Sequence, residues 1–487
     1  MFSLLPGCSE LSRFTLTSRI AVAGLSVLTL AVPDESDAGE ADLPPETPAS
    51  AAAVQPESVP ATSKPPLTWP TLPFAAWVGV ETVYVRSLPR VPAALSGVLK
   101  LGDTVQVTGC KPDCANPKAW ALLGESGAVK LAVLRLGPVP KAARDMSSVA
   151  QYHWGKVPRP ATRVFAAPSL KSNVLRKEKA EFRLAFVPDE ALFSLGWLQR
   201  PDGGFMRAKD VVLFQPSRYV GAHFDHGPPS TGVLAFVRRK TRLQPLRPDL
   251  PGVKTPPVFV NRYDRFEVEA LRGSRVQVPG GWLPRNRVRI AHGQKRPKEV
   301  KPIDKWLHID LAEQVLTAYE GDRMVFATLV STGKTDRRST KTPAGTFKVY
   351  AKTVHSSMRG KPWDDYYAEE IPHVLHFDGG RAIHGTYWHD QFGIQKSHGC
   401  INLSLADVKW VFDWAPPAKP DGWHSVMPFG KQAAAWVVVE KSGGRIRLQT
   451  PGLAQGKAAG PNLAAEGGVP QPPDLSSLPV DAGATGR

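Results

Sequence analysis

The sequence predicts a mainly β protein, in which several small β-barrels precede a larger, mostly-β domain with one or two short helices. Short stretches of alternating apolar and polar residues recur between residues 73 and 295, with turn residues about every 8–12 positions, a spacing typical of small barrels. The same alternation continues through 305–333. Only one stretch, "SLADVKWVFDWA" at 404–415, is clearly typical of an amphipathic helix.

The two ends of the chain differ from this pattern. The 487 residues include 47 prolines, which are concentrated near both ends, so we expect a disordered linker at 34–72 and a loose tail at 446–487. At 1–33, basic residues precede a mostly apolar stretch that is shorter than the roughly 20 residues of a membrane-spanning helix. We interpret 1–33 as a signal peptide, or alternatively as an uncleaved anchor, which predicts export to the periplasm or cell envelope.

The stretch between linker and C-terminal domain contains three variants of one unit, at 73–140, 155–216 and 230–295. Each offers short alternating strands, a turn, a tryptophan and a final strand, as in "LGWLQRPDGGFMRAKDVVLF" of the second unit. This pattern resembles bacterial SH3-like domains. The first copy fits best, and the other two are degenerate.

The C-terminal domain is predicted at 300–445. Its segment 305–333 should form three strands separated by tight turns, and six of its residues should face a core: Trp306, Ile309, Val315, Leu316, Val325 and Leu329. Ser404 should cap the helix that follows, with Asp407 at its third helical position, and Pro416–Pro417 should end it. Trp410 and Trp414 share one face of this helix, which we expect to lie in the core.

The net charge of +17 suits either nucleic acid or an anionic cell envelope as a partner. The basic residues form no single arm or helix face, and no nucleic-acid recognition motif accompanies them, so we expect no nucleic-acid partner. We expect instead that the three units hold the C-terminal domain on cell-wall polymer through their charge and exposed aromatic residues such as Trp197 and Trp282, while 300–445 alone acts on small soluble peptides.

Four cysteines are present. Cys110 and Cys114 are close enough in sequence for a local disulfide, whereas a metal pair would need two more ligands nearby. Cys400 is left as a candidate reactive thiol.

The stretch "IHGTYWHDQFGIQKSHGCIN" at 383–402 surrounds that thiol with three histidines. A thiol is mostly protonated at neutral pH, so a nucleophilic cysteine needs a nearby base or backbone dipoles. His384 ends an apolar strand and can be brought beside Cys400, and Gly399 allows a sharp turn that points amides at an oxyanion. A zinc site built from His384, His389, His398 and Cys400 is disfavoured, because two of these ligands are separated only by Gly399.

"IHGT" followed at this spacing by "SHGCIN" resembles the L,D-transpeptidase catalytic domain of the YkuD-like family, over about 305–440. The resemblance implies that Cys400 is the nucleophile and His384 the base that forms a thiolate–imidazolium pair with it. It also implies roles for the neighbouring residues. The carbonyl of Gly385 would orient the imidazole, amides of His398, Gly399 and Cys400 would form an oxyanion hole, Ser397 and Asn402 would brace the turn and contact substrate, and His398 would touch donor substrate.

The same resemblance implies an activity. Cys400 would form a thioester with a peptidoglycan stem peptide, and an amine of a second stem would resolve it into a 3→3 cross-link, without metal or organic cofactor and with sensitivity to carbapenem-type inhibitors. Resolution by water, as in an L,D-carboxypeptidase, and attachment of a protein lysine stay open. A non-catalytic scaffold that binds the cell wall is a further alternative, from another class of function. The insertion at 351–380, with His373 and His376, should form a lid or wall over the site.

Overall fold

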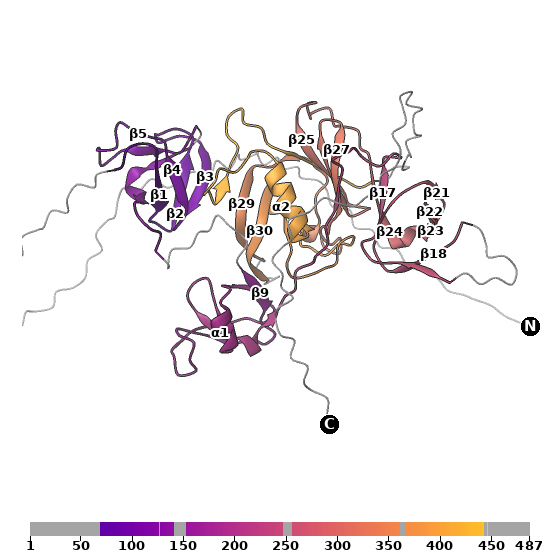
Figure 1. The fold of residues 1–487 in the computed structure, drawn as a ribbon, viewed down its shortest axis with the longest axis horizontal. Coiled ribbons are helices and arrows are strands. Elements are labelled where there is room, and N and C mark those ends of the chain that lie inside the picture. The colour runs from indigo at the N-terminus through magenta and orange to yellow at the C-terminus, as the bar shows by residue number, and fades with distance from the viewer. Residues whose placement is uncertain are drawn as a thin grey trace, which may run out of the picture. The chain divides into compact units, whose positions relative to one another are not determined.

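The computed structural model describes residues 69–125, 127–140, 152–246, 256–360, 366–442 and 446. The expected signal peptide or anchor at 1–33, most of the linker at 34–72 and nearly all of the tail at 446–487 lie outside these residues. Within the described ranges, no helix has the length and apolar character needed to cross a membrane. Strands predominate, as the sequence predicts (Figure 1).

Module 1 (residues 69–140) is built from short strands around an apolar core that includes Val78, Val85, Leu99 and Val107. Cys110 and Cys114 form a disulfide at the edge of this module, as expected. The strands are β1 (Phe74–Val78), β2 (Thr82–Arg86), β3 (Leu95–Lys100), β4 (Thr104–Val107), β5 (Gly109–Lys111), β6 (Trp120–Leu122), β7 (Ala128–Lys130) and β8 (Leu134–Arg135).

Module 2 (residues 152–214) has its own core, which includes Val164, Leu184 and Phe186. Trp197, expected to be exposed, is half-buried, because its ring lies edge-on against Phe165 at 5.5 Å. The elements are β9 (His153–Lys156), β10 (Thr162–Phe165), β11 (Val174–Glu178), β12 (Arg183–Phe186), α1 (Glu190–Ser194), β13 (Trp197–Gln199), β14 (Phe205–Arg207) and β15 (Val212–Leu213).

Module 3 (residues 233–292) follows a connector that carries the short strand β16 (Ala222–His223). Trp282, also expected to be exposed, is half-buried beneath the guanidinium group of Arg272. The strands are β17 (Val233–Val237), β18 (Thr241–Leu243), β19 (Val258–Val260), β20 (Arg265–Glu267), β21 (Ala270–Arg272), β22 (Arg275–Val278), β23 (Gly281–Pro284) and β24 (Val288–His292).

The three modules end in the same way, which fits their interpretation as variants of one unit. In each, a single turn of 3-10 helix precedes the last strand: η1 (Leu131–Val133), η2 (Ala208–Asp210) and η3 (Arg285–Arg287). The likeness to SH3 domains in particular stays a prediction.

The C-terminal domain (residues 305–440) contains the three expected strands and the expected helix. Its elements are β25 (Lys305–Asp310), β26 (Val315–Glu320), β27 (Arg323–Leu329), η4 (Arg338–Thr340), β28 (Gly345–Lys348), β29 (Ala351–Arg359), β30 (Tyr367–Asp378), β31 (Arg381–Gly385), β32 (Ile401–Leu403), α2 (Leu405–Trp414), β33 (Ser425–Val426) and β34 (Trp436–Glu440). Ser404 caps α2 by accepting a hydrogen bond from the Asp407 amide, as predicted.

All six predicted core residues of 305–333 are buried, but they belong to two cores rather than one. Ile309, Leu316 and Val325 pack against α2 and β30 on one face of the sheet β27–β26–β25–β34–β28. Trp306, Val315 and Leu329 lie on the opposite face and pack against residues of module 3 and the connector. Alternation does not reveal that both faces of the sheet are covered, and it does not separate Val325 from Leu329, which are four positions apart and belong to different cores.

The insertion at 351–380 forms a long antiparallel hairpin of β29 and β30, with α2 beside it (Figure 1). Residues 361–365, which lie between these two strands in the sequence, are outside the described ranges. Trp410 and Trp414, expected in the core, are only partly buried, because they stack on each other at the margin of the cluster that α2 covers.

Modules 1 and 2 join the C-terminal domain through strand pairing. Module 1 pairs β3 with β33, module 2 pairs β12 in parallel with β30, and the connector pairs β16 with β27. Trp423 of the C-terminal domain is 3% exposed because it lies in the core of module 1. These shared sheets and cores argue against the expectation that 300–445 forms an independent working unit.

Candidate active site

Two neighbouring strands position the candidate base and nucleophile. Strands β31 and β32 are parallel, with Ile383 opposite Ile401 and His384 opposite Asn402. Cys400 immediately precedes β32 and lies two positions before Asn402, which places the two side chains on the same face. The predicted pair therefore lies on one face of adjacent strands, buried by the apolar residues Ile383, Ile401 and Leu403 behind it.

The turn before Cys400 depends on glycine and serine. Gly399 has a φ of +123°, which disfavours any residue with a Cβ. Ser397 Oγ accepts a hydrogen bond from the Gly399 amide at 3.1 Å and donates one to the Cys400 carbonyl at 2.5 Å. Ser397 therefore braces the turn, as predicted. The Gly399 amide, expected in the oxyanion hole, already has this internal acceptor.

The side chain of a threonine that was not identified from the sequence also holds this turn. Thr342 Oγ1 donates to the Gly399 carbonyl at 2.9 Å and accepts from the Gly333 amide at 2.8 Å. The Lys334 amide also donates to the Ser397 carbonyl at 3.0 Å. The segment 333–342 thus fixes the turn from one side. Its "TKTPAG" motif offered the only sequence signal for this support.

His384 is 2% exposed, and its ring nitrogen Nδ1 lies 2.9 Å from the Gly385 carbonyl, as the resemblance implied. A carbonyl can only accept, so Nδ1 carries the proton and Nε2 is left with a free lone pair. Burial lowers the pKa of His384 to about 4, although the Gly385 hydrogen bond opposes this shift. The imidazole is therefore neutral at pH 7 and can accept a proton.

Cys400 is a half-buried residue with a free thiol. Burial raises the pKa of this thiol, while a hydrogen bond with the backbone of Ala382 and the charge of Arg381 oppose the rise. Together with the lowered pKa of His384, this favours a neutral thiol and a neutral imidazole in the resting protein. Both shifts oppose the thiolate–imidazolium pair that the resemblance implies, and this pair stays a prediction.

Aromatic side chains surround these residues. The His398 ring stacks on Tyr366, at the end of the hairpin, with centroids 4.6 Å apart. The ring of Trp388 lies 5.9 Å from that of His384. The hairpin thus supplies a wall beside the site, as predicted, but neither Tyr366 nor Trp388 was identified from the sequence.

The remaining predicted residues contact other parts of the domain. Asn402 does not contact the cysteine turn through its side chain, because its amide lies 3.2 Å from His389 Nε2, while its backbone pairs with Ser331. His373 contacts Phe412 of α2, and His376 lies beside Tyr350 and also contributes to lowering the pKa of His384. Among the described residues, no group of three or more His, Cys, Asp or Glu side chains is arranged to hold a metal ion.

Comparison with known proteins defines the class to which this fold and site belong. Residues 304–428 match the family model of the L,D-transpeptidase catalytic domain, YkuD. This segment is therefore an L,D-transpeptidase catalytic domain, and such a domain indicates an acyltransferase.

One curated relative is the putative L,D-transpeptidase YciB of Bacillus subtilis, which is 25% identical over 127 residues. That match covers 24% of this chain and 64% of YciB, so this chain spans somewhat less than two thirds of its relative.

Solved structures of similar sequence include an L,D-transpeptidase of Xylanimonas cellulosilytica, 25% identical over 30% of this chain and 65% of that one, with a TM-score of 0.22. Another is the catalytic domain of an E. faecium L,D-transpeptidase acylated by ertapenem, 26% identical over 26% of this chain and 97% of that one, with a TM-score of 0.21.

Proposed function

We propose that this protein is an exported peptidoglycan L,D-transpeptidase that forms 3→3 cross-links through a thioester on Cys400. One observation supports this most directly. Within the matched catalytic domain, Cys400 and His384 lie on one face of β31 and β32, and the Gly385 carbonyl fixes the imidazole tautomer with its lone pair at Nε2.

The first half-reaction is acylation. His384 Nε2 takes the thiol proton as Cys400 Sγ attacks the carbonyl carbon of the diamino acid at the third position of the donor stem. The tetrahedral intermediate then collapses, the bond to the terminal D-alanine breaks, and His384 returns its proton to the departing amine. Backbone amides of His398 and Cys400 would stabilise the oxyanion.

The second half-reaction releases the thiol. An amine from a second stem attacks the thioester carbonyl and loses a proton to His384, a new amide forms, and the proton returns to Cys400 sulfur. Water in place of this amine would give an L,D-carboxypeptidase, and a protein lysine would give protein attached to the wall. The catalytic geometry serves all three outcomes, and the acceptor decides between them.

The neutral resting pair agrees with this path. The buried imidazole is unprotonated at neutral pH, so it is ready to accept the thiol proton during attack. Carbapenem-type inhibitors would acylate the same thiol, a proposal supported by the structure of the E. faecium catalytic domain acylated by ertapenem.

The first test replaces the nucleophile. Cys400→Ala should abolish conversion of purified muropeptides, because Cys400 is the free cysteine among the residues that the structure describes, and Cys400→Ser should be nearly as inactive. Mass spectrometry of the products separates cross-linked dimer, trimmed monomer and unchanged stem. Circular dichroism should show both variants folded, since the thiol is small. Cross-linking retained by Cys400→Ala would exclude the mechanism, whereas a wild-type protein that binds the wall and converts no muropeptide would favour the wall-binding scaffold.

A further inference from the structure

The structure places an arginine of module 2 beside the catalytic residues. Arg183 is the first residue of β12 and lies opposite Ala368 of the hairpin strand β30. It shares a face with Ala185, which is buried in a cluster with Tyr387, Ile371 and Trp154. This face of β12 is therefore turned toward the catalytic domain and away from the module's own core.

The guanidinium group of Arg183 lies among the aromatic side chains that frame the site. Its central carbon is 5.4 Å from the centre of the Trp388 ring, which itself lies 5.9 Å from the His384 ring. Burial lowers the pKa of Arg183, and the nearby hydroxyls of Tyr387 and Tyr366 are among the groups that oppose this shift. Tyr366, which contributes to the electrostatic environment of Arg183, stacks on His398.

This cation has no carboxylate partner in the part of the chain that the structure describes. Glu181 is the acidic residue that contributes to its electrostatic environment, and that carboxylate is 3.1 Å from the ammonium group of Lys156. A guanidinium group held against aromatic rings, with its N–H groups available, is suited to bind a carboxylate through two parallel hydrogen bonds.

We propose that Arg183 is a substrate-positioning residue that binds a carboxylate of the donor stem peptide close to the bond that Cys400 attacks. This inference rests on the proposed function. The stem offers two such groups, the terminal carboxylate of D-alanine and the side-chain carboxylate of a diaminopimelate-type residue. Module 2 is then part of the active site, in addition to any role it has in binding the wall.

The experiment compares three donors with the full chain and with Arg183→Ala: the free acid, its terminal carboxamide, and the analogue whose side-chain carboxyl is amidated. For the wild type, amidation of the recognised group should lower kcat/KM by about tenfold to a hundredfold, as loss of a hydrogen-bonded ion pair does. Arg183→Ala should lower kcat/KM for the free acid by a similar factor, mainly through KM, and the variant should no longer distinguish that analogue from the free acid.

Three controls test whether the effect is specific to the Arg183 guanidinium group. Arg163→Ala removes another module 2 arginine that lies over an aromatic ring, Phe165, and should change nothing. The rate of Cys400 alkylation should be equal in wild type and Arg183→Ala, which shows that the site is folded. Arg183→Lys should recover part of the discrimination.

Two results would overturn the inference: unchanged kinetics in Arg183→Ala, or an equal loss with all three donors. A wild-type protein that converts no donor would instead contradict the proposed function itself.

Discussion

Cys400 and His384 carry the proposed chemistry as neutral groups. Buried surroundings lower the pKa of the imidazole to about 4 and raise that of the thiol, so both shifts oppose a preformed ion pair. The thiolate then arises only as the proton moves to His384. This differs from a nucleophile that is already ionised at rest, and the two cases have different pH profiles.

The pH dependence of Cys400 alkylation by iodoacetamide distinguishes a thiol that is neutral at rest from a preformed thiolate. The wild-type rate should keep rising with pH above 7, without the acidic plateau of a preformed thiolate. The acid limb of the activity profile should fall near pH 4, because His384 stays neutral down to its lowered pKa. His384→Gln should alkylate more slowly at neutral pH, since the thiol loses its proton acceptor.

His389→Gln is a suitable control, because His389 contacts Asn402 and not the Gly385 carbonyl. An alkylation profile that His384→Gln leaves unchanged would assign the base to His398 instead.

At the scale of single residues, the sequence predicted much of the candidate site. The spacing of "IHGT" and "SHGCIN" was enough to select Cys400, His384, Gly385 and Ser397. The hydrogen bond from Thr342 and the stacking of Tyr366 on His398 could not be predicted, because both connect segments that meet only in the folded chain.

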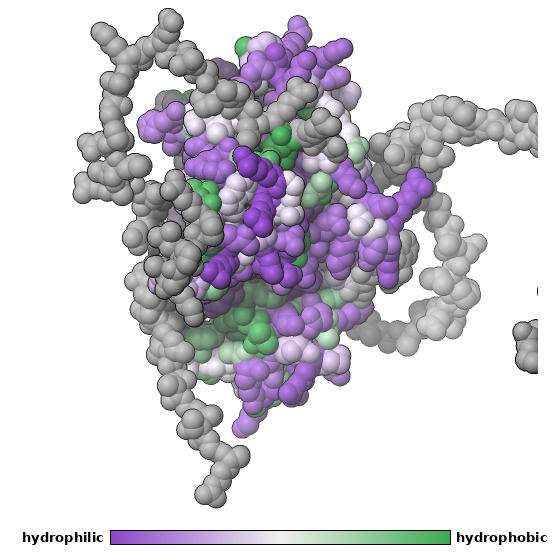
Figure 2. All heavy atoms as spheres, turned by 90° about the vertical axis from the view of Figure 1, so that its right-hand side faces the viewer, coloured by the Kyte–Doolittle hydropathy of each residue, from purple (hydrophilic) through white to green (hydrophobic). Residues whose placement is uncertain are grey.

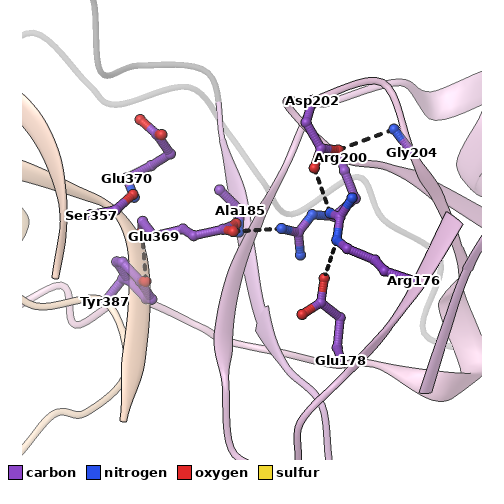
Figure 3. Close-up of polar contacts among 10 residues, drawn as sticks. All are labelled: Arg176, Glu178, Ala185, Arg200, Asp202, Gly204, Ser357, Glu369, Glu370 and Tyr387. Carbon is purple, nitrogen blue, oxygen red and sulfur yellow. Dashed lines mark hydrogen bonds and ion pairs between the residues drawn. The ribbon is translucent and has the colours of Figure 1, made fainter. Parts of the chain in front are cut away.

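Strand β30 connects the catalytic domain to module 2. It pairs with β29 and β31 within its domain and with β12 of the module. Figure 3 shows Glu369 of β30 directed at module 2, where it pairs with Arg200 and accepts a hydrogen bond from the Ala185 amide at 3.0 Å. The Tyr387 hydroxyl donates to the Glu369 carbonyl at 2.8 Å, so the same residue also holds the segment that follows His384.

This ion pair is buried, with side chains 3% and 11% exposed, and burial raises the pKa of Glu369 against the opposing charge of Arg200. Arg200→Met should destabilise the contact by about 3–5 kcal/mol, because it leaves an unpaired buried carboxylate. Hydrogen–deuterium exchange measured by mass spectrometry should increase in peptides covering β12 and β30.

The double variant Arg200→Met/Glu369→Leu should exchange less than the single variant, since no buried charge is left without a partner. Equal exchange in wild type and Arg200→Met would show that this pair does not hold the module on the hairpin. No motif or spacing indicates this ion pair, because its members are 169 positions apart.

At the scale of the whole molecule, positive charge lies on module surfaces. Module 3 carries exposed basic residues at Arg239, Lys240, Arg242, Arg272 and Arg275. Figure 2 shows mostly hydrophilic residues on the face of the molecule that lies at the right of Figure 1, where the strands of module 3 are labelled. Arg289, Arg239 and Arg287 also contribute, after burial, to lowering the pKa of Arg238, as expected where cations cluster.

We expect the full chain to co-sediment with peptidoglycan sacculi at low salt and less at high salt, because salt screens exposed charges over a Debye length of about 8 Å near physiological strength. Arg239→Glu/Lys240→Glu should weaken co-sedimentation at low salt without changing turnover of small stem peptides. Salt-independent sedimentation, equal in both proteins, would assign these residues another role.

Charge variants test the binding of the modules to the wall better than truncation of the protein to 300–445 does. The sequence indicated separate units, because turn signals and alternation repeat within each of them. It did not reveal their shared cores, since Trp423 in module 1 and Trp306 against module 3 are indistinguishable in sequence from ordinary core residues of their own domain. A truncated protein would expose these surfaces and lose stability for reasons unrelated to the wall.

The raised pKa of the Cys400 thiol also has a consequence for the proposed enzyme, which we expect in an oxidising cell envelope. Peroxide reacts with thiolates, and its first product, a sulfenic acid, forms most readily at exposed cysteines of low pKa. Cys400 is half-buried and its pKa is raised, while Cys110 and Cys114 are already joined. We therefore expect the raised pKa of Cys400 to slow the oxidation of this thiol by peroxide in the absence of substrate.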